Sequence, residues 1–501
     1  MARYAIPLLI IAAALVAAAC RPGNGETHPL ECYRSMAVDA YTLSPGDIKA
    51  GIAAMAAADS DRSAAAKHTK SYYANGGRPL WVSVPGLHGS ADSVLAVLAA
   101  AAEYGMDKEA FGHGRIAADM AAMRTLDFPR GDNAGAVAAR LEYNLTKACL
   151  AYSAGQGFGF SDPSTQTSDS GAVASRRLFD IPTERPGEAF FKQAIDSIRR
   201  GRGAGLMKSA TPASPLFARL KGMLARPGLQ AGERRRILCN MERCRWRTAD
   251  SPEKRSRYVL VNIPSYRLRM VQGDSAVEMR VGCGAADTKT PMLAGLLKRM
   301  DFNPQWIIPQ SIVERGISAH AGNAAYFARK DYMVVRQRDW AEQDPGRLTR
   351  EDLESGAYRV VQRGGPGNPL GRVIFRFDNS HAIYLHDTST RHFFQSGDRG
   401  VSHGCIRVER PRDLALFLLQ GKAGEYAEKV GYTMAADVFG KEAADTLDRR
   451  LVVRSLPVEP RVPVFILYHT LYPAVDGTME SHPDVYGYDA TLYRRIKRYC
   501  L

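Results

Sequence analysis

A cysteine and a histidine lie two positions apart in one short stretch, Ser402-His403-Gly404-Cys405-Ile406-Arg407, and a further histidine lies upstream at position 386. A thiolate is a strong nucleophile, but a free cysteine has a pKa of about 8.5 and is mostly protonated at neutral pH. An imidazole within hydrogen-bond reach can take that proton and later return it to a leaving amine. Gly404 has no Cβ, so backbone N–H groups of His403, Gly404 and Cys405 can approach a developing oxyanion. The pattern predicts a nucleophilic cysteine served by a histidine.

Two imidazoles compete for the role of base. His386 ends a predicted strand, so rigid backbone would hold its ring, and it precedes Cys405 by 19 positions. His403 lies two residues from Cys405, and on an extended segment the two side chains share a face. We favour His386 and keep His403 as the alternative.

Three other interpretations of this stretch carry less weight. A lone cysteine is usually a small buried hydrophobe. Two histidines and a cysteine can hold zinc, but positions 386, 403 and 405 lack the paired spacing of zinc sites and have no fourth ligand nearby. A papain-like protease places its cysteine before its histidine, and here the order is reversed.

The residues after 257 supply the elements that would position this chemistry. Short β-rich runs are bounded there by Gly, Pro, Asn and Asp. The expected strands are 258–263 and 267–272, which form a hairpin, then 277–282, then 373–377 and 382–386, which form a second pair, and finally 464–468.

Residues from about 31 to 250 contain few strand-like runs and read as helical. Residues 50–66 are alanine-rich, which favours a helix. The Ser/Thr/Asp/Gly-rich stretch 161–175 reads as a loop. The other expected helices are 90–104, 134–152, 188–200, one that starts near Pro215, and 232–246.

The first residues read as a secretory signal. Ala2-Arg3 is a positive region, and the apolar run 5–19 is shorter than the roughly 20 residues of a membrane span. Ala17-Ala18-Ala19-Cys20 is similar to a bacterial lipobox, which would make Cys20 the lipidated first residue. An ordinary signal peptide cut near Cys20 is the alternative. Either version predicts a protein that works outside the cytoplasm.

The composition fits a globular, basic protein. The chain has 501 residues, 45% of them hydrophobic, and a formal net charge of +15. Such a charge favours contact with a membrane surface or an anionic envelope polymer, or simply keeps the protein soluble. Without zinc-finger spacing or a basic helix interleaved with aromatics, nucleic acid is not expected as a partner. Of eight cysteines, the six besides Cys20 and Cys405 can form up to three disulfides or stay reduced.

Tyr384-Leu385-His386-Asp387-Thr388, followed by the cysteine stretch, resembles the signature of the L,D-transpeptidases with a YkuD-type catalytic domain. The similarity is specific over about residues 257–412. Further matching segments at 258–268, 289–291 and 302–306 resemble the large YcbB-like branch.

This resemblance implies a multidomain α+β fold. A lipoprotein-type signal peptide (1–19) and a tether (20–30) would precede a helical scaffold domain (31–250). A mixed, β-rich catalytic domain (257–445) would follow, with a capping subdomain inserted at about 309–369. The segment 446–501 would pack on the catalytic domain.

The resemblance also implies an activity. Cys405 would attack the carbonyl between the diamino acid and the terminal D-alanine of a peptidoglycan stem tetrapeptide. A second stem would take the acyl group and form a 3→3 cross-link. Acylation by carbapenems is a further trait of the family. Hydrolysis, attachment of an envelope protein to peptidoglycan, or an inactive wall-binding scaffold are the alternatives.

Roles for other residues follow from the same resemblance. The backbone of Asp387 would orient His386. Candidate substrate-binding residues are Arg407, Ser402, Tyr384 and Trp306, with bracing of the loop as the alternative for Arg407 and a place in the core as the alternative for Tyr384 and Trp306. No metal or organic cofactor is implied. The expected partners are peptidoglycan stem peptides and, through a lipid anchor, a membrane on the periplasmic side of the envelope.

Overall fold

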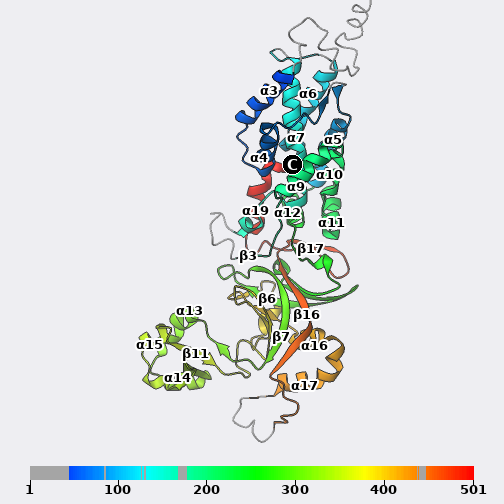
Figure 1. Cartoon of the computed structure of the whole chain (residues 1–501). Helices are drawn as coiled ribbons and strands as arrows, with labels where there is room; N and C mark the ends of the chain where they lie inside the picture. Colours follow the sequence, from blue (N-terminus) through cyan, green and yellow to red (C-terminus); the bar gives the residue numbers. More distant parts are fainter. Residues whose placement is uncertain are drawn as a thin grey trace, which may run out of the picture. The chain divides into compact units, whose positions relative to one another are not determined.

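The chain divides into two compact units, shown in the computed structural model of Figure 1. The structure describes residues 45–501 except 84–85, 126, 129–130, 168–177, 437 and 439–446. Within the described residues, the helical unit comprises 45–166, 182–249 and 489–501, and the β-rich unit comprises 167, 178–181 and 250–488. The predicted signal peptide, the tether and Cys20 lie outside the described residues.

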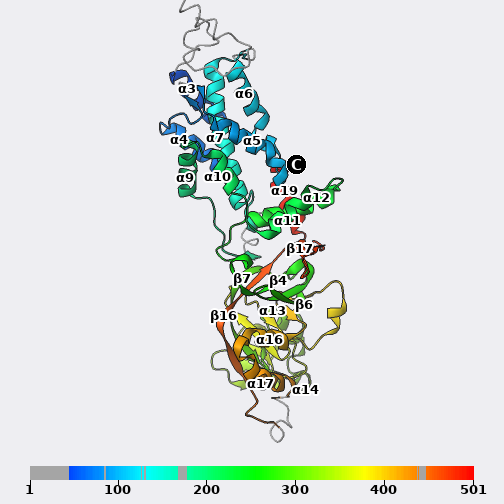
Figure 2. The same ribbon diagram turned by 90° about the vertical axis from the view of Figure 1, so that its right-hand side faces the viewer.

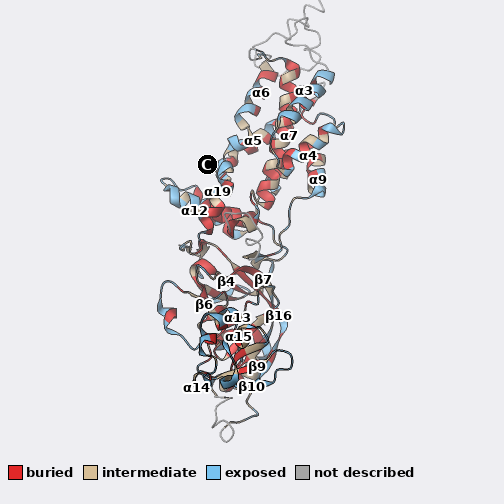
Figure 3. Cartoon of the chain, turned by 90° about the vertical axis from the view of Figure 1, so that its left-hand side faces the viewer, coloured by how far each residue is buried: buried red, intermediate tan, exposed pale blue. Residues whose placement is uncertain are grey.

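The helical unit is built around α7 (Ala134–Phe158), which is buried along most of its length (Figure 3). Its apolar side chains recur on all sides, as expected of a helix enclosed by others. Helices α3, α4, α6 and α10 pack against it. The surrounding helices are α3 (Pro45–Ala58), α4 (Ala64–Ala74), α5 (Ser90–Ala99), α6 (His113–Thr125), α9 (Glu188–Arg199), α10 (Gly203–Ser209), α11 (Pro215–Leu224), α12 (Ala231–Arg245) and α19 (Tyr488–Ile496).

A buried carboxylate inside α7 fixes the Leu-Trp segment of this unit. Glu142 accepts hydrogen bonds from the backbone N–H groups of Leu80 (2.9 Å), Trp81 (2.7 Å) and Val82 (2.6 Å). These bonds offset the cost of removing the carboxylate from water. Nothing in the sequence pattern distinguishes Glu142 from an ordinary polar residue of a helix.

The predicted helix over residues 50–66 is two helices, α3 and α4. Between them, Asp61 accepts the N–H of Ser63 (2.8 Å), and the Ser63 hydroxyl accepts the N–H of Ala66 (3.2 Å). Ser63 is therefore the N-cap of α4, and a cap starts a new helix where alanine content alone suggests continuation. The predicted helix over 90–104 likewise ends at Ala99 and continues as a 3₁₀ turn over Ala100–Tyr104.

The β-rich unit contains a ten-stranded mixed sheet in its described residues. Strand β12 pairs with both β13 and β7, so the sheet closes on itself. In sheet order the strands are β12 (Val373–Phe377), β13 (Leu385–His386), β15 (Ile406–Val408), β6 (Ser275–Gly284), β5 (Arg267–Gln272), β4 (Arg257–Asn262), β16 (Ser455–Leu467), β7 (Met292–Phe302) and β3 (Phe179–Asp180), and β14 (Gly400–Ser402) pairs with β6. Helix α16 (Pro411–Leu419) packs against β16, and α17 (Ala423–Ala435) packs against α16 (Figure 2).

Sequence reasoning found part of this sheet. The predicted hairpin is present as β4 and β5, with Val259 opposite Met270. The eleven-residue strand β7 has no counterpart among the predicted strands. Strand β16 begins nine residues before the predicted strand at 464–468 and lies between β4 and β7.

The predicted role of residues 446–501 differs from the structure. Strand β16 belongs to the sheet, because Ser455–Pro457 and Val462–Ile466 pair with β7 and Val464–Leu467 pair with β4 on the other side. Asp489–Leu501 groups with the helical unit, where the Asp489 carboxylate accepts a 2.6 Å hydrogen bond from Arg243 Nη1. The segment is therefore divided between the two units.

The stretch between β7 and β12 folds as a small body with its own sheet and core, and it projects from the main sheet on the side opposite α16 and α17 (Figure 1). The sequence suggested helix-like and loop segments here, but four short strands pair within it. They are β8 (Trp306–Ile307), β9 (Tyr332–Arg336), β10 (Glu342–Gln343) and β11 (Tyr358–Gln362), joined by α13 (Gln310–Ile312), α14 (Ala324–Arg329) and α15 (Arg350–Glu354). The core contains Ile308, Val313, Ile317, Phe327, Val334, Leu353 and Val360.

Two further observations concern only the described part of the chain. No helix there combines the length and the apolar character needed to cross a bilayer. No pair of its cysteines is disulfide-bonded.

Candidate active site

His386 lies in the centre of the β-rich unit, on the short strand β13 between β12 and β15. Its side chain is buried, with 4% exposure, and its Nδ1 lies 2.5 Å from the carbonyl oxygen of Asp387. Burial, assisted by the positive charge of Arg407, lowers the pKa of His386 to about 4. The ring is therefore neutral at pH 7, and donation of Nδ1–H to Asp387 leaves the lone pair on Nε2.

The Asp387 backbone is itself held in place. The Asp387 carboxylate accepts hydrogen bonds from the backbone N–H of Arg372 (2.8 Å) and from Arg391 Nη1 (3.1 Å). Gly371 has a φ of +62°, and a Cβ at that position would lie 2.5 Å from the Asp387 side chain. Gly371, in the loop before β12, therefore packs directly against Asp387, whose carbonyl orients the His386 ring.

Cys405 immediately precedes β15, which runs parallel to β13 with Arg407 opposite His386. Side chains alternate along a strand, so Cys405 lies on the same face as Arg407 and His386. Burial raises the pKa of Cys405 and lowers that of His386, and the positive charge of Arg407 opposes the first shift and adds to the second, which agrees with this grouping.

The Cys405 thiol is held in a neutral state at rest. Burial raises its pKa, although the Tyr384 backbone and Arg407 act in the opposite direction. The sulfur lies 3.9 Å from the carbonyl oxygen of Ala382. Among the described residues, no hydrogen bond joins this thiol to the His386 ring.

The loop that carries Cys405 is fixed by two hydroxyl groups. Ser402 Oγ donates to the Cys405 carbonyl (2.5 Å) and accepts the N–H of Gly404 (3.1 Å). Thr290 Oγ1 donates to the Gly404 carbonyl (2.8 Å) and accepts the N–H of Gly284 (2.8 Å). Gly404 has a φ of +114°, a conformation that residues with a Cβ rarely adopt.

These hydrogen bonds limit which amides can hold an oxyanion. The sequence suggested the N–H groups of His403, Gly404 and Cys405, but that of Gly404 is already bound to Ser402. Within the described structure, no group accepts a hydrogen bond from the other two amides. The amides of His403 and Cys405 are therefore the ones open to a substrate oxygen.

The remaining predicted site residues fall in different places. Arg407 is half-buried beside the Phe393 ring, and its Nε has no hydrogen-bond partner among the described residues. His403 is exposed. Tyr384 is half-buried, with the Arg376 guanidinium 5.1 Å from its ring centroid.

Trp306 and Ser402, two of the candidate substrate-binding residues, make contacts within the protein. Trp306 lies on β8, where it packs against the core of the inserted body. Ser402 is buried and uses its hydroxyl within the loop. The structure thus brings His386, Cys405 and Arg407 together on one face and gives Ser402 a supporting position.

Sequence reasoning did not assign a role to two supporting residues. Thr290 lies in the segment 289–291 that carried part of the resemblance, which is a usable signal. Tyr486 accepts the N–H of Thr290 (3.1 Å) and donates its hydroxyl to the Gly284 carbonyl (2.7 Å), across 202 positions. No local pattern identifies Tyr486.

Comparisons with known proteins agree with this geometry. Residues 256–430 match the family model of the L,D-transpeptidase catalytic domain, and residues 66–224 match that of the scaffold domain. A Haemophilus influenzae protein named "Putative L,D-transpeptidase" is 30% identical over 234 residues. The aligned region covers 46% of this chain and 44% of that relative, so the chain spans less than half the length of the relative it matches.

Proposed function

We propose that this chain forms 3→3 cross-links in peptidoglycan through a thioester on Cys405. It is a member of the L,D-transpeptidase family and, like YcbB-like proteins, has a YkuD-type catalytic domain and a scaffold domain. The observation that carries this proposal is the placement of Cys405 and His386 on one face of two adjacent parallel strands. A buried neutral imidazole with Nδ1–H engaged is in the protonation state that a general base requires.

The proposed reaction begins with the neutral pair. His386 Nε2 takes the thiol proton as Sγ forms a bond to the carbonyl carbon of the donor stem, while the amides of His403 and Cys405 hold the oxyanion. The C–N bond to the terminal D-alanine breaks, and His386 returns the proton to the leaving amine. The amine of a second stem then attacks the thioester carbonyl carbon and gives its proton to His386 Nε2. The C–S bond breaks, and His386 returns that proton to the Cys405 sulfur.

Two other outcomes share the same acyl-enzyme. Water as acceptor gives L,D-carboxypeptidase activity, and an envelope protein as acceptor gives its attachment to peptidoglycan. Each differs from cross-linking only in the group that attacks the thioester.

The basic charge of the chain and the lipobox-like stretch before Cys20 support a location at the periplasmic side of the envelope, with a lipid anchor on Cys20.

The test uses purified full chain and a soluble disaccharide-tetrapeptide, with products identified by mass spectrometry. We expect a dimer that has lost one D-alanine, and a Cys405→Ser variant that folds but forms none. Monomer tripeptide as the main product would favour hydrolysis. Dimer at wild-type rate from Cys405→Ser would exclude the thioester mechanism.

A further inference from the structure

One buried amide is hydrogen-bonded both to the inserted body and to the turn that supports the base. Asn368 belongs to the loop that leads from β11 to β12, and it is only 1% exposed. A polar side chain that is removed from water needs hydrogen-bond partners inside the protein. The side-chain nitrogen and oxygen of Asn368 are both engaged, and their partners show what this residue holds together.

The nitrogen of the Asn368 side chain binds both ends of the inserted body. Nδ2 donates to the carbonyl of Pro304 (3.1 Å), just before β8, and to the carbonyl of Arg363 (3.1 Å), just after β11. Pro304 is 64 positions away from Asn368 in the sequence. One side chain therefore fixes the points at which the chain enters and leaves the inserted body.

The oxygen atoms of Asn368 hold the turn that follows it. The side-chain Oδ1 accepts the N–H of Leu370 (2.8 Å), and the backbone carbonyl accepts the N–H of Gly371 (2.9 Å). Two successive backbone amides are thus fixed by a single residue. Loss of the Asn368 side chain would free the first of them and would separate the turn from the inserted body.

This turn contacts the two residues that define the base. Gly371 packs against Asp387, where a Cβ on the glycine would come within 2.5 Å of the Asp387 side chain. The Leu370 backbone interacts with the His386 ring, where it opposes the lowering of the His386 pKa by burial. Arg372, the next residue, donates its N–H to the Asp387 carboxylate (2.8 Å). Displacement of the turn would therefore move the carbonyl that holds His386 Nδ1.

We infer that Asn368 is a positioning residue for the base: by holding the Leu370–Gly371 turn against Asp387, it keeps the His386 ring in the orientation that proton transfer needs. The inference rests on the proposed function, because it takes His386 as the base for the Cys405 thiol. Asn368 acts through the turn, since in the described structure its hydrogen bonds go to the turn and the inserted body.

The test is a double-mutant cycle on the full chain, in which the rate constant and the affinity of Cys405 acylation by a carbapenem are measured separately. Asn368→Ala should slow acylation by about 10–100-fold with little change in affinity, because a small misplacement of a catalytic group costs up to ~10²-fold in rate. In the His386→Ala background, the same change should have almost no further effect, since the group that Asn368 positions is absent.

A second variant covers the case in which Asn368→Ala does not fold, as judged by circular dichroism. The hydroxyl of Asn368→Ser can accept the Leu370 N–H, as serine does in turns, but it cannot donate to both carbonyls of the inserted body. This variant should fold and should lose less of the acylation rate than Asn368→Ala. Its effect should also disappear in the His386→Ala background.

The matched control is Asn262→Ala. Asn262 is also buried, and its side chain donates to the His469 carbonyl (3.0 Å) and accepts the His469 N–H (2.8 Å). It lies at the end of β4, and three strands separate β4 from β13 in the sheet. Asn262→Ala should lower the melting temperature but leave the acylation rate unchanged.

Four results would overturn the inference. They are an unchanged acylation rate in both Asn368 variants, equal slowing of wild type and of His386→Ala by the Asn368 change, an effect on affinity alone, and equal slowing by Asn262→Ala. Each leaves the acylation of wild type intact and so does not touch the proposed function. Wild type that is not acylated at Cys405, or His386→Ala that reacts as fast as wild type, would instead refute the proposed mechanism and the inference with it.

Discussion

Replacing His386 with alanine tests the assignment of the base. At pH 7 a group with a pKa of about 4 is protonated in roughly one molecule in a thousand, so almost every enzyme molecule carries the free base. A positioned general base contributes ~10²–10⁴-fold to rate. We therefore expect acylation of Cys405 by a carbapenem to slow by about 10²–10⁴-fold in His386→Ala at pH 7.

The pH dependence adds a second signature. In wild type, the neutral pair persists between the low pKa of His386 and the raised pKa of Cys405, so the acylation rate should be nearly constant from about pH 5 to 8. In His386→Ala the reaction needs a preformed thiolate, whose fraction grows about tenfold per pH unit below the thiol pKa. The variant should therefore recover steadily toward and beyond pH 9.

The assay is the acylation rate by intact-mass spectrometry across pH, with circular dichroism to show that each variant is folded. His403→Ala is the matched control, and because His403 is exposed we expect only a small, pH-independent loss. A large, pH-rescuable loss in His403→Ala with little effect of His386→Ala would reverse the two roles. A wild-type inflection near pH 6.5 would contradict the burial argument.

Three further changes test the surroundings of the site. Thr290→Val leaves the Gly284 N–H and the Gly404 carbonyl without their hydrogen-bond partner, which should lower the free energy of unfolding by ~1–3 kcal/mol for each group. Both the melting temperature and the acylation rate should therefore fall, whereas Thr290→Ser should retain most of each. Gly371→Ala places a Cβ against the Asp387 side chain at a backbone φ of +62°, and should slow acylation more than it alters carbapenem affinity. An effect on affinity alone would refute the role of Gly371 in positioning Asp387 and, through it, His386. Cys20→Ala should move the protein from the detergent phase to the aqueous phase, and wild type found wholly in the aqueous phase would leave only an ordinary signal peptide.

Local patterns were sufficient for elements whose stabilising contacts are close in sequence. The hairpin β4–β5 forms between neighbouring runs, and α7 follows its helical apolar spacing. Alanine content alone predicts one helix across the break between α3 and α4, whereas Ser63 is an N-cap residue that marks the start of α4 in the sequence.

The sheet was harder to predict because its order depends on distant partners. Strand β7 pairs with β12, β16 and β3, which lie far from it in the sequence on both sides. Strand β16 joins β4 across most of the β-rich unit, since Val464 pairs with Val259. Such pairings have no local signal, so neither the length of β16 nor the closure of the sheet follows from periodicity.

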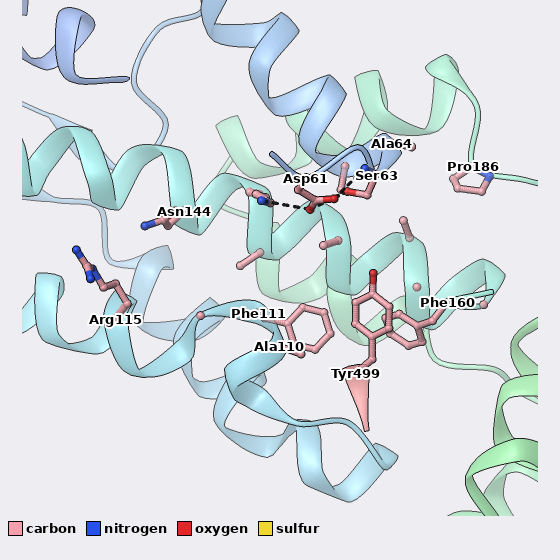
Figure 4. A pocket seen from close by; sticks show the side chains of 18 residues that line it. Asp61, Ser63, Ala64, Ala110, Phe111, Arg115, Asn144, Phe160, Pro186 and Tyr499 are labelled. Carbon is pink, nitrogen blue, oxygen red and sulfur yellow. Dashed lines mark hydrogen bonds and ion pairs between the residues drawn. The ribbon is translucent and has the colours of Figure 1, made fainter. Parts of the chain in front are cut away.

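The sequence by itself determined the candidate reactive residues and the order of helical and β-rich parts, because residue type and short-range spacing define them. Tertiary structure decided how those residues can work. It committed the Gly404 amide to Ser402, supported Gly404 through Thr290 and Tyr486, and divided the C-terminal segment between two units. It also placed Tyr499 beside Phe160, where both residues line a depression in the helical unit (Figure 4). The Ser402–Gly404 hydrogen bond is local, but the other contacts join residues more than a hundred positions apart, and such contacts exist only once the backbone has brought the residues together.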